Sequence, residues 1–149
     1  MCSYCGCEAE PAIVALMEDH ASIASLIRDI ERHLDDGEDA HAFEYTADLM
    51  VMFRHHTRME ERGLFEQLQV AGEGVDEVAD LLTDHREIMA GLSVAADNSD
   101  GALLRRVLGR LTIHAQTEDN DLFPFALQRL PNENWAAMEE VHQATLARG

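Results

Sequence analysis

Four helix-length amphipathic segments make up most of the chain, and this patterning most constrains its fold. In each segment apolar residues recur at spacings of three and four, as on the buried face of an α-helix. Strand patterns are missing, because β-branched residues are sparse and apolar–polar alternation does not persist. Short clusters of helix-breaking residues separate the segments near 35–37, 72–74 and 97–101. The sequence therefore predicts an all-α protein.

The spacing of the segments also predicts how the helices are connected. The first segment begins at Pro11, and proline is well suited to the first position of a helix. Helices of about 20–30 residues joined by short loops favour antiparallel neighbours. We therefore expect an up-down-up-down four-helix bundle.

A shorter fifth helix is expected at the C-terminal end, where Asn132 can cap it after Pro131. Its expected apolar face is Trp135, Met138, Val141 and Leu146. We divide the chain into a cysteine-containing tail at 1–10, the bundle at 11–130 and a helix packed on the bundle at 131–149.

Length and charge limit the classes of function. With 149 residues, 46% of them apolar, the chain can bury a core without disulfide help. Its net charge of −18, from 29 acidic and 11 basic residues, repels nucleic acids and anionic membranes, so we expect neither as a partner. Residues 1–11 lack a basic and apolar leader pattern, and no apolar run approaches about 20 residues, so we expect a cytoplasmic protein.

Each of the four segments has a histidine where its apolar stripe calls for a leucine. Two of the segments add a glutamate four residues later, which lies on the same helix face. At a rise of about 1.5 Å per residue, the four histidines lie at similar distances from the connecting loops and can share one layer of the bundle. The agreement is poorest between the second and third segments, where an irregular stretch near Gly63 or Gly72 would make up the difference. One such histidine would be an ordinary core residue, but six polar groups in one layer are too costly to bury without a metal. The six are His20, His56, Glu60, His85, His114 and Glu118.

The donor types narrow the choice of metal. Four imidazoles and two carboxylates are too many for one tetrahedral zinc ion, and no thiolate joins them. The set is too rich in nitrogen for calcium or magnesium. A pair of iron ions fits, with manganese also possible. Glu60 and Glu118 come from opposite helices and can each bridge the pair, leaving two histidines for each ion.

The two halves of the chain repeat one pattern: a histidine, then His-x-x-x-Glu, then Leu-Phe. This order, together with Asp84-His85 and Leu122-Phe123-Pro124, resembles the hemerythrin-like (HHE cation-binding) family in its bacterial single-domain form, over about residues 11–130. The resemblance implies an oxo- or hydroxo-bridged di-iron centre that binds dioxygen, peroxide, nitric oxide or small anions. It also implies that the four histidines are terminal ligands and that Glu60 and Glu118 bridge.

One departure from the oxygen-carrying members affects the expected chemistry. Those proteins place a fifth histidine on helix three, where this chain has Leu81 and Met89. One iron is then a ligand short, and water, hydroxide or another side chain fills the position. We expect a protein that consumes or senses reactive oxygen or nitrogen species, with peroxidase, catalase-like or nitric oxide peroxidase activity possible. The alternatives are a non-catalytic oxygen or nitric oxide binder, an iron store, and a structural bundle that binds zinc adventitiously.

Other polar residues are expected outside the ligand set. His33, His41 and His142 are predicted to lie at the surface or at helix ends, and His55 is predicted to lie at the surface or in an interface. Glu61 and Asp119 are expected to support the ligands or face solvent. Asp119 follows His114 by five residues, the spacing of the aspartate bridge in oxygen carriers, so it competes with Glu118; we prefer Glu118.

The three cysteines, Cys2, Cys5 and Cys7, lie within the first seven residues and cannot staple the fold. They fit a thiolate metal site, a redox switch, an iron-delivery segment or a tail of reduced thiols. Three thiols are one short of a closed four-cysteine site. We therefore favour the reduced tail.

Overall fold

The computed structural model describes residues 10–148, and over this range the chain forms helices and turns but no strand. The elements, with η marking a π-helix, are α1 (Pro11–Asp35), α2 (Asp39–Glu60), η2 (Glu61–Phe65), α3 (Glu66–Ala71), α4 (Val75–Asp97), α5 (Gly101–Thr117), η3 (Glu118–Leu122), α6 (Phe123–Arg129) and α7 (Asn132–Arg148). The prediction of an all-α protein is confirmed.

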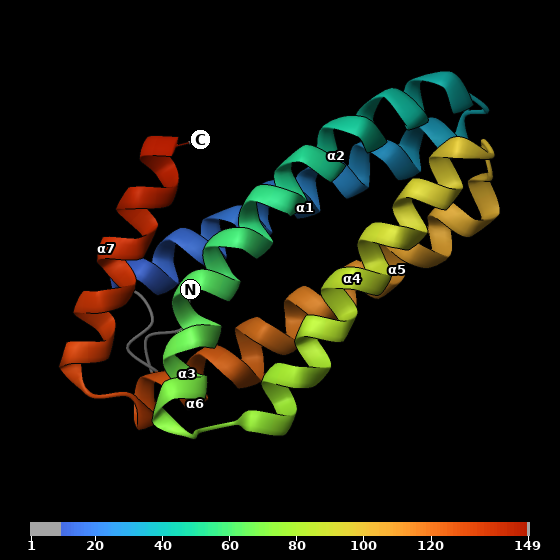
Figure 1. The fold of residues 1–149 in the computed structure, drawn as a ribbon. Helices are drawn as coiled ribbons and strands as arrows, with labels where there is room; N and C mark the ends of the chain where they lie inside the picture. Colours follow the sequence, from blue (N-terminus) through green and yellow to red (C-terminus); the bar gives the residue numbers. More distant parts are fainter. Residues whose placement is uncertain (1–9, 149) are drawn as a thin grey trace.

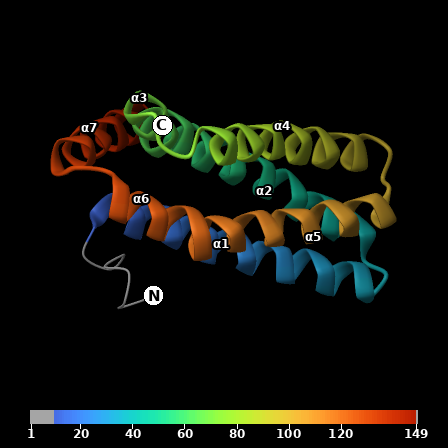
Figure 2. The same cartoon turned by 90° about the horizontal axis from the view of Figure 1, so that it is seen from below.

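The long helices form two pairs that pack face to face. Helix α1 lies beside α2, and α4 lies beside α5 (Figure 1). Contacts between α2 and α4, and between α1 and α5, join the two pairs (Figure 2). Helix α7 lies across one end, where it contacts η2, α1 and α2.

The helix boundaries follow from local chemistry. Helix α1 begins at Pro11, as predicted. Helix α5 begins after Asp100, whose side chain accepts a hydrogen bond from the backbone N–H of Leu103 and so satisfies one of the unpaired N–H groups of the first turn. The turn before α4 contains Gly72 and Gly74 with φ of +70° and +60°, a conformation that glycine adopts without a steric penalty.

The apolar core is in two parts. Among the larger buried residues of one part are Leu16, Met59, Leu64, Phe65, Leu81 and Leu122. Among those of the other are Ile23, Phe53, Ile88, Leu92 and Leu111. On each long helical segment, the predicted ligand residues fall between a residue of the first part and a residue of the second. The polar layer is therefore enclosed by apolar side chains at both ends.

The second and fourth predicted helices are not regular throughout. A π-helical turn follows directly after Thr117, at Glu118–Leu122, and another after Glu60, at Glu61–Phe65. The predicted irregularity near Gly63 is thus confirmed. Pro124 lies in the first turn of α6, directly after the π-turn Glu118–Leu122, and the helix continues beyond it to Arg129.

The predicted apolar face of α7 is partly wrong. Trp135 and Met138 are buried as expected, but Leu146 is 55% exposed. His142 and Thr145 occupy the buried positions instead, and His142 is only 2% exposed. Both residue sets fit the period of a helix, so the phase was ambiguous after Met138. The expectation that His142 lies at the surface or a helix end is therefore wrong.

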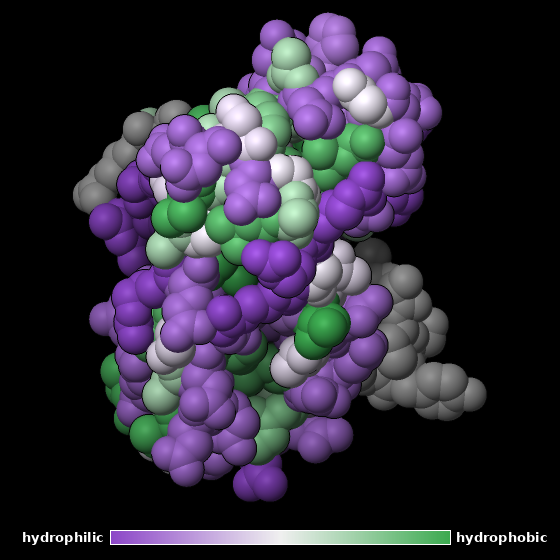
Figure 3. Space-filling model, turned by 90° about the vertical axis from the view of Figure 1, so that its right-hand side faces the viewer, coloured by the Kyte–Doolittle hydropathy of each residue, from purple (hydrophilic) through white to green (hydrophobic). Residues whose placement is uncertain are grey.

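No helix among residues 10–148 combines the length and apolar character needed to cross a membrane. Figure 3 shows the face that carries the α1–α2 and α4–α5 turns. It is mainly hydrophilic, and apolar side chains appear in separate small areas between polar ones. Large apolar side chains are thus gathered in the interior at this end of the molecule.

Candidate metal centre

The six predicted ligand residues lie together in one buried layer. Glu60 and Glu118 are fully buried, and the four histidines are each at most 6% exposed. Their donor atoms form two groups, and in each group all the atoms lie within 4.8 Å of one another. One group is His20, His56, Glu60 and Glu118; the other is Glu60, His85, His114 and Glu118. The two glutamates belong to both groups.

The Nε2 atoms of the histidines face this shared pair of carboxylates. His20 Nε2 is 3.0 Å from Glu118 Oε1 and 3.1 Å from His56 Nε2. His85 Nε2 is 3.0 Å from Glu60 Oε1. Two donors bound at right angles to one metal, each about 2.1 Å from it, lie about 3 Å apart. The spacing of these atoms therefore fits donors that surround common ions.

Several inward-facing atoms are buried and make no well-aligned hydrogen bond among the described residues, although His85 Nε2 and Glu60 Oε1 lie 3.0 Å apart. They are Glu60 Oε1 and Oε2, His85 Nε2, His114 Nε2 and Glu118 Oε2. Orphaned polar atoms in a protein interior are costly and call for a partner. Imidazole nitrogens and carboxylate oxygens are donors that bind transition metals well. The residues present therefore fit a pair of metal ions.

A carboxylate lies on the outer side of each of the four predicted ligand histidines. Each imidazole uses Nδ1 for this contact, which leaves Nε2 as the donor that faces the layer. The pairs are His20 with Asp119 at 2.8 Å, His56 with Asp19 at 2.9 Å, His85 with Glu61 at 2.7 Å and His114 with Asp84 at 3.3 Å. Such contacts fix the orientation of the ring and raise its basicity toward a metal.

These outer contacts follow the internal repeat. Asp19 and Asp84 each precede the first histidine of their own half and contact the second histidine of that half. Glu61 and Asp119 each follow a glutamate of the layer and contact the first histidine of the other half. The halves are thus held together by two reciprocal hydrogen bonds as well as by apolar packing.

The Leu-Phe pairs of the repeat also contribute across the halves. Phe65 stacks on His85, with ring centroids 5.4 Å apart, and Phe123 stacks on His20 at 5.7 Å. Stacking covers the ring faces and restricts rotation of the imidazoles. Sequence reasoning had used these pairs only as signs of the repeat.

Protons balance the charges of the layer in the metal-free chain. Burial lowers the pKa of His20, but the contacts with Asp119 and Glu118 outweigh it and raise the pKa to about 10. Burial likewise lowers the pKa of His85, while Glu60 and Glu61 raise it to about 10. Metal ions bound in the layer would replace these protons as the positive charge.

The two glutamates have opposite pKa shifts. Burial, with the nearby charge of Glu118, raises the pKa of Glu60. Glu118 is buried too, but Glu60, His114 and His20 lower its pKa. One carboxyl of this close pair thus tends to hold a proton while the other is ionised, as expected for two acids that share a small site.

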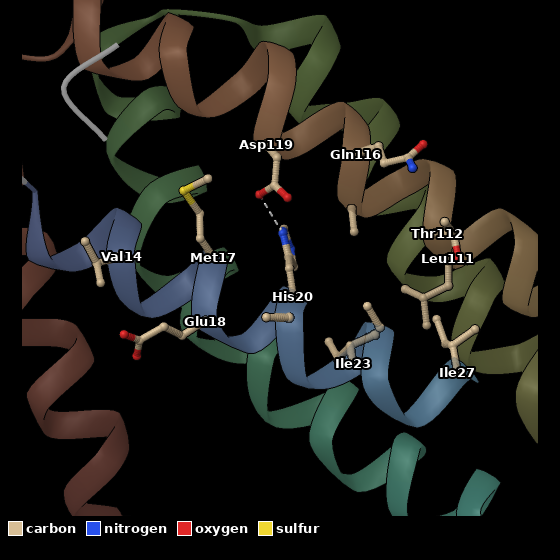
Figure 4. A pocket seen from close by; sticks show the side chains of 13 residues that line it. Val14, Met17, Glu18, His20, Ile23, Ile27, Leu111, Thr112, Gln116 and Asp119 are labelled. Carbon is tan, nitrogen blue, oxygen red and sulfur yellow. Dashed lines mark hydrogen bonds and ion pairs between the residues drawn. The ribbon is translucent and has the colours of Figure 1, made fainter. Parts of the chain in front are cut away.

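A groove gives access to one side of the layer. It lies between α1 and the segment formed by α5 and η3, and its volume is about 420 Å³. Apolar side chains such as Met17 and Ile27 line it, and His20 with Asp119 lies at its base (Figure 4). Small molecules can therefore approach a predicted ligand through mainly apolar surroundings.

The structure places the competing candidates apart. Glu118 belongs to both donor groups, whereas Asp119 is 29% exposed and contacts the outer nitrogen of His20.

Other predicted positions lie outside the layer. Leu81, at one position of the absent fifth histidine, is buried in the apolar core. Of the predicted outer histidines, His33 contacts both His41 and Tyr45. Cys2, Cys5 and Cys7 lie outside the described residues.

Sequence reasoning missed one buried histidine beside the layer. His142 packs on the π-turn, where a Cβ added at Gly63 would meet His142 Nε2 at 2.8 Å. Neither ring nitrogen of His142 has a hydrogen-bond partner among the described residues. Burial lowers its pKa, which keeps the ring neutral. The spacing Trp135, Met138, His142 was the available sign of its burial.

The fold and the site together define a class: all-helical proteins with a buried histidine–carboxylate layer that can hold metal cations. Comparison with protein families agrees with this class. The chain belongs to the family described as hemerythrin HHE cation binding domain, whose model matches residues 12–126. Searches among curated proteins and among solved structures gave no match.

Proposed function

We propose that the layer holds two iron ions and that the protein reacts with peroxide, nitric oxide or dioxygen. The observation that carries the proposal is the pair of donor groups that share Glu60 and Glu118. Two carboxylates common to both groups are the arrangement that two adjacent ions require. Iron supplies the redox chemistry when bound, and the chain supplies donors, orientation and a largely apolar enclosure.

The proposed ligand roles follow from this arrangement. His20 and His56 are terminal ligands of one ion, and His85 and His114 are terminal ligands of the other. Glu60 and Glu118 bridge the two. An octahedral ion takes about six ligands, and each group provides four residues. Positions therefore remain for an oxo or hydroxo bridge and for small exogenous ligands.

The surroundings favour reaction over reversible carriage. Leu81 offers no donor where the oxygen carriers have a further imidazole, and the groove of about 420 Å³ leads to His20. Both features support an open centre that peroxide or nitric oxide can reach. The groove is mainly apolar, which suits small neutral molecules better than ions.

We also infer that the four long segments run up-down-up-down as a four-helix bundle. Contacts join α1 to α2, α2 to α4, α4 to α5 and α5 to α1, and the turns after α1 and α4 are short. Helices joined by short turns pack as antiparallel neighbours.

Metal analysis and turnover assays test the proposal together. The full chain, expressed in iron-replete medium, should contain about two irons, as the two donor groups require. The iron-loaded protein should then remove peroxide, alone or with nitric oxide, faster than the same amount of free iron. Zinc in place of iron would contradict the metal assignment. Two irons with no turnover, and a gas complex that forms reversibly, would instead support a binding protein.

A further inference from the structure

The eleven basic residues of this acidic chain are all arginines, and four of them gather on one face. Arg54, Arg58 and Arg62 recur every four residues on α2 and η2, so they form one stripe. Arg86 lies on the neighbouring helix α4. All four are exposed. We call these four residues the arginine face.

The arginine face surrounds two adjoining hollows. One, of about 430 Å³, is lined by Arg54 and Arg86, with Thr57, Glu61 and His85. The other, of about 270 Å³, adds Arg58 and Arg62 and shares Glu61 with the first. Both hollows are open to solvent.

Three arginines elsewhere in the described chain have acidic neighbours, among them Arg32, which pairs with Asp29. Arg105 pairs with Asp35, and Arg110 pairs with Asp84. The four guanidinium groups of the arginine face have no acidic partner within ion-pair distance among residues 10–148. Single unpaired arginines occur elsewhere, but four gathered around adjoining hollows form a local positive charge that attracts anionic groups on a protein of net charge −18.

The face is absent from the equivalent place in the other half. The residues that correspond to it by the repeat are Thr112, Gln116, Asn120 and Ala21, none of them charged. That equivalent place contains the apolar groove over His20. The metal layer is thus approached by two different surfaces, one apolar and one cationic.

The floor of the arginine face leads directly to the layer. Glu61 lies between the hollows, and its Oε2 is 2.7 Å from His85 Nδ1. His85 Nε2 in turn is 3.0 Å from Glu60. One hydrogen bond, one imidazole ring and a further 3.0 Å contact therefore separate this surface from the proposed bridging carboxylate.

We propose that the arginine face docks the acidic surface of a one-electron donor protein that reduces the metal centre. Arg54 and Arg62 lie about 12 Å apart along the helix axis, too far for one small anion to contact both. The open hollows would bury little of a small molecule, whereas a protein surface presents several carboxylates at such spacings. Each donor loses one electron and one ferric ion becomes ferrous, with no bond made or broken. This inference rests on the proposed iron chemistry.

A binding titration tests the docking without depending on turnover. The iron-loaded full chain is titrated with an acidic plant-type [2Fe–2S] ferredoxin as the probe, by calorimetry at low and at high ionic strength. We expect binding that weakens with salt, and about tenfold weaker binding by the double variant R54Q/R58Q. The matched control R28Q/R106Q removes the same charge at exposed arginines elsewhere and should change affinity by less than about twofold.

Three results would overturn the docking proposal. They are equal weakening by both double variants, absence of binding by the unmodified chain, and arginine-dependent binding of inorganic pyrophosphate without binding of ferredoxin. The pair R62Q/R86Q replaces R54Q/R58Q if the latter does not fold. Reduction of the iron by pre-reduced ferredoxin should slow in parallel with binding. Peroxide turnover without ferredoxin binding would reject docking alone, and arginine-dependent binding without turnover would reject only the proposed reaction.

Discussion

The half formed by α1, α2, η2 and α3 carries the same polar pattern as the half formed by α4, α5, η3 and α6, yet their neighbours differ. Helix α7 covers the first half at η2. Gly63 lies beneath His142 there, while Asp121, its counterpart in the second half, is exposed. The inward-facing residues are thus nearly duplicated, but the outer surfaces are not.

The carboxylates on the outer side of the histidines also have different neighbours in the two halves. Asp84 is contacted by Arg110 at 2.8 Å as well as by His114, and although burial raises its pKa, these two neighbours lower it overall. Asp19 contacts His56 and has no arginine partner among the described residues. The two predicted ions would therefore have similar donors but different electrostatic surroundings, which suggests that they differ in affinity.

The largest expected effect comes from removing a shared carboxylate. In Glu60→Ala or Glu118→Ala both ions lose a proposed bridge, so iron content should fall from about two per chain to less than about one. Colorimetric iron analysis measures this, and Glu66→Ala, at an exposed acid, is the control. If Glu60→Ala kept its iron while Glu118→Ala lost it, the two halves would not contribute equally.

The outer carboxylates should have a smaller and unequal effect. Asp19→Asn and Asp84→Asn should each weaken metal binding by about 10- to 100-fold, because they weaken the support of a ligand imidazole. We expect the larger loss for Asp19→Asn, since Asp84 is shared with Arg110 and lies 3.3 Å from His114, against 2.9 Å for Asp19 and His56. Competition with a chelator gives the affinities, and an equal loss would remove the predicted difference between the ions.

Helix α7 provides a comparison based on packing. Gly63→Ala places a Cβ 2.8 Å from His142 Nε2 and 3.1 Å from Met138 Cγ, so we expect a loss of about 1–3 kcal/mol in the free energy of unfolding. Asp121→Ala at the equivalent exposed position should change it by less than about 0.5 kcal/mol. Urea unfolding measures both, and a neutral Gly63→Ala would show that α7 is free to move away.

The pH dependence of the metal-free chain should be gradual and similar in the two halves. The pKa values of His20 and His85 are raised from 6.5 to about 10, so the folded chain keeps protons that the unfolded chain releases. Their contribution to stability is complete below pH 6.5 and is lost as the pH rises toward 10. Unfolding midpoints of the chelator-treated protein measure the slope. His20→Gln and His85→Gln should each reduce this dependence of the unfolding midpoint on pH. If only one of the two variants did so, the halves would contribute unequally to it.

The sequence predicted the polar layer because its residues interrupt strong apolar periodicity. Histidines such as His20 and His85 stand out among leucines and isoleucines, and the structure buries them together. The outer carboxylates were harder to assign, because Asp19 and Asp84 look like any acidic residue on a helix. Their role depends on a neighbouring helix that the chain's own period does not reveal.

The phase of α7 and the π-turns depend on tertiary packing. After Met138 the helix period allows either Val141 or His142 to face inward, and contact with Gly63 decides between them. The sequence suggested irregularity near Gly63 but not the width of the turn. Nor did it show that Glu118–Leu122 repeats the same geometry.

Each π-turn carries a carboxylate that contacts a histidine of the other half. In a regular α-helix adjacent residues project about 100° apart, so Glu60 and Glu61 would turn toward different sides. Glu60, the last residue of α2, faces the layer, while Glu61, the first residue of the π-turn, contacts the outer nitrogen of His85. We expect deletion of one residue within 61–65 to restore α-helical winding in this stretch. The repeat of this chain thus includes helix geometry as well as residue identity, and a redesign that straightened these turns would keep all six predicted donors yet move their supporting carboxylates.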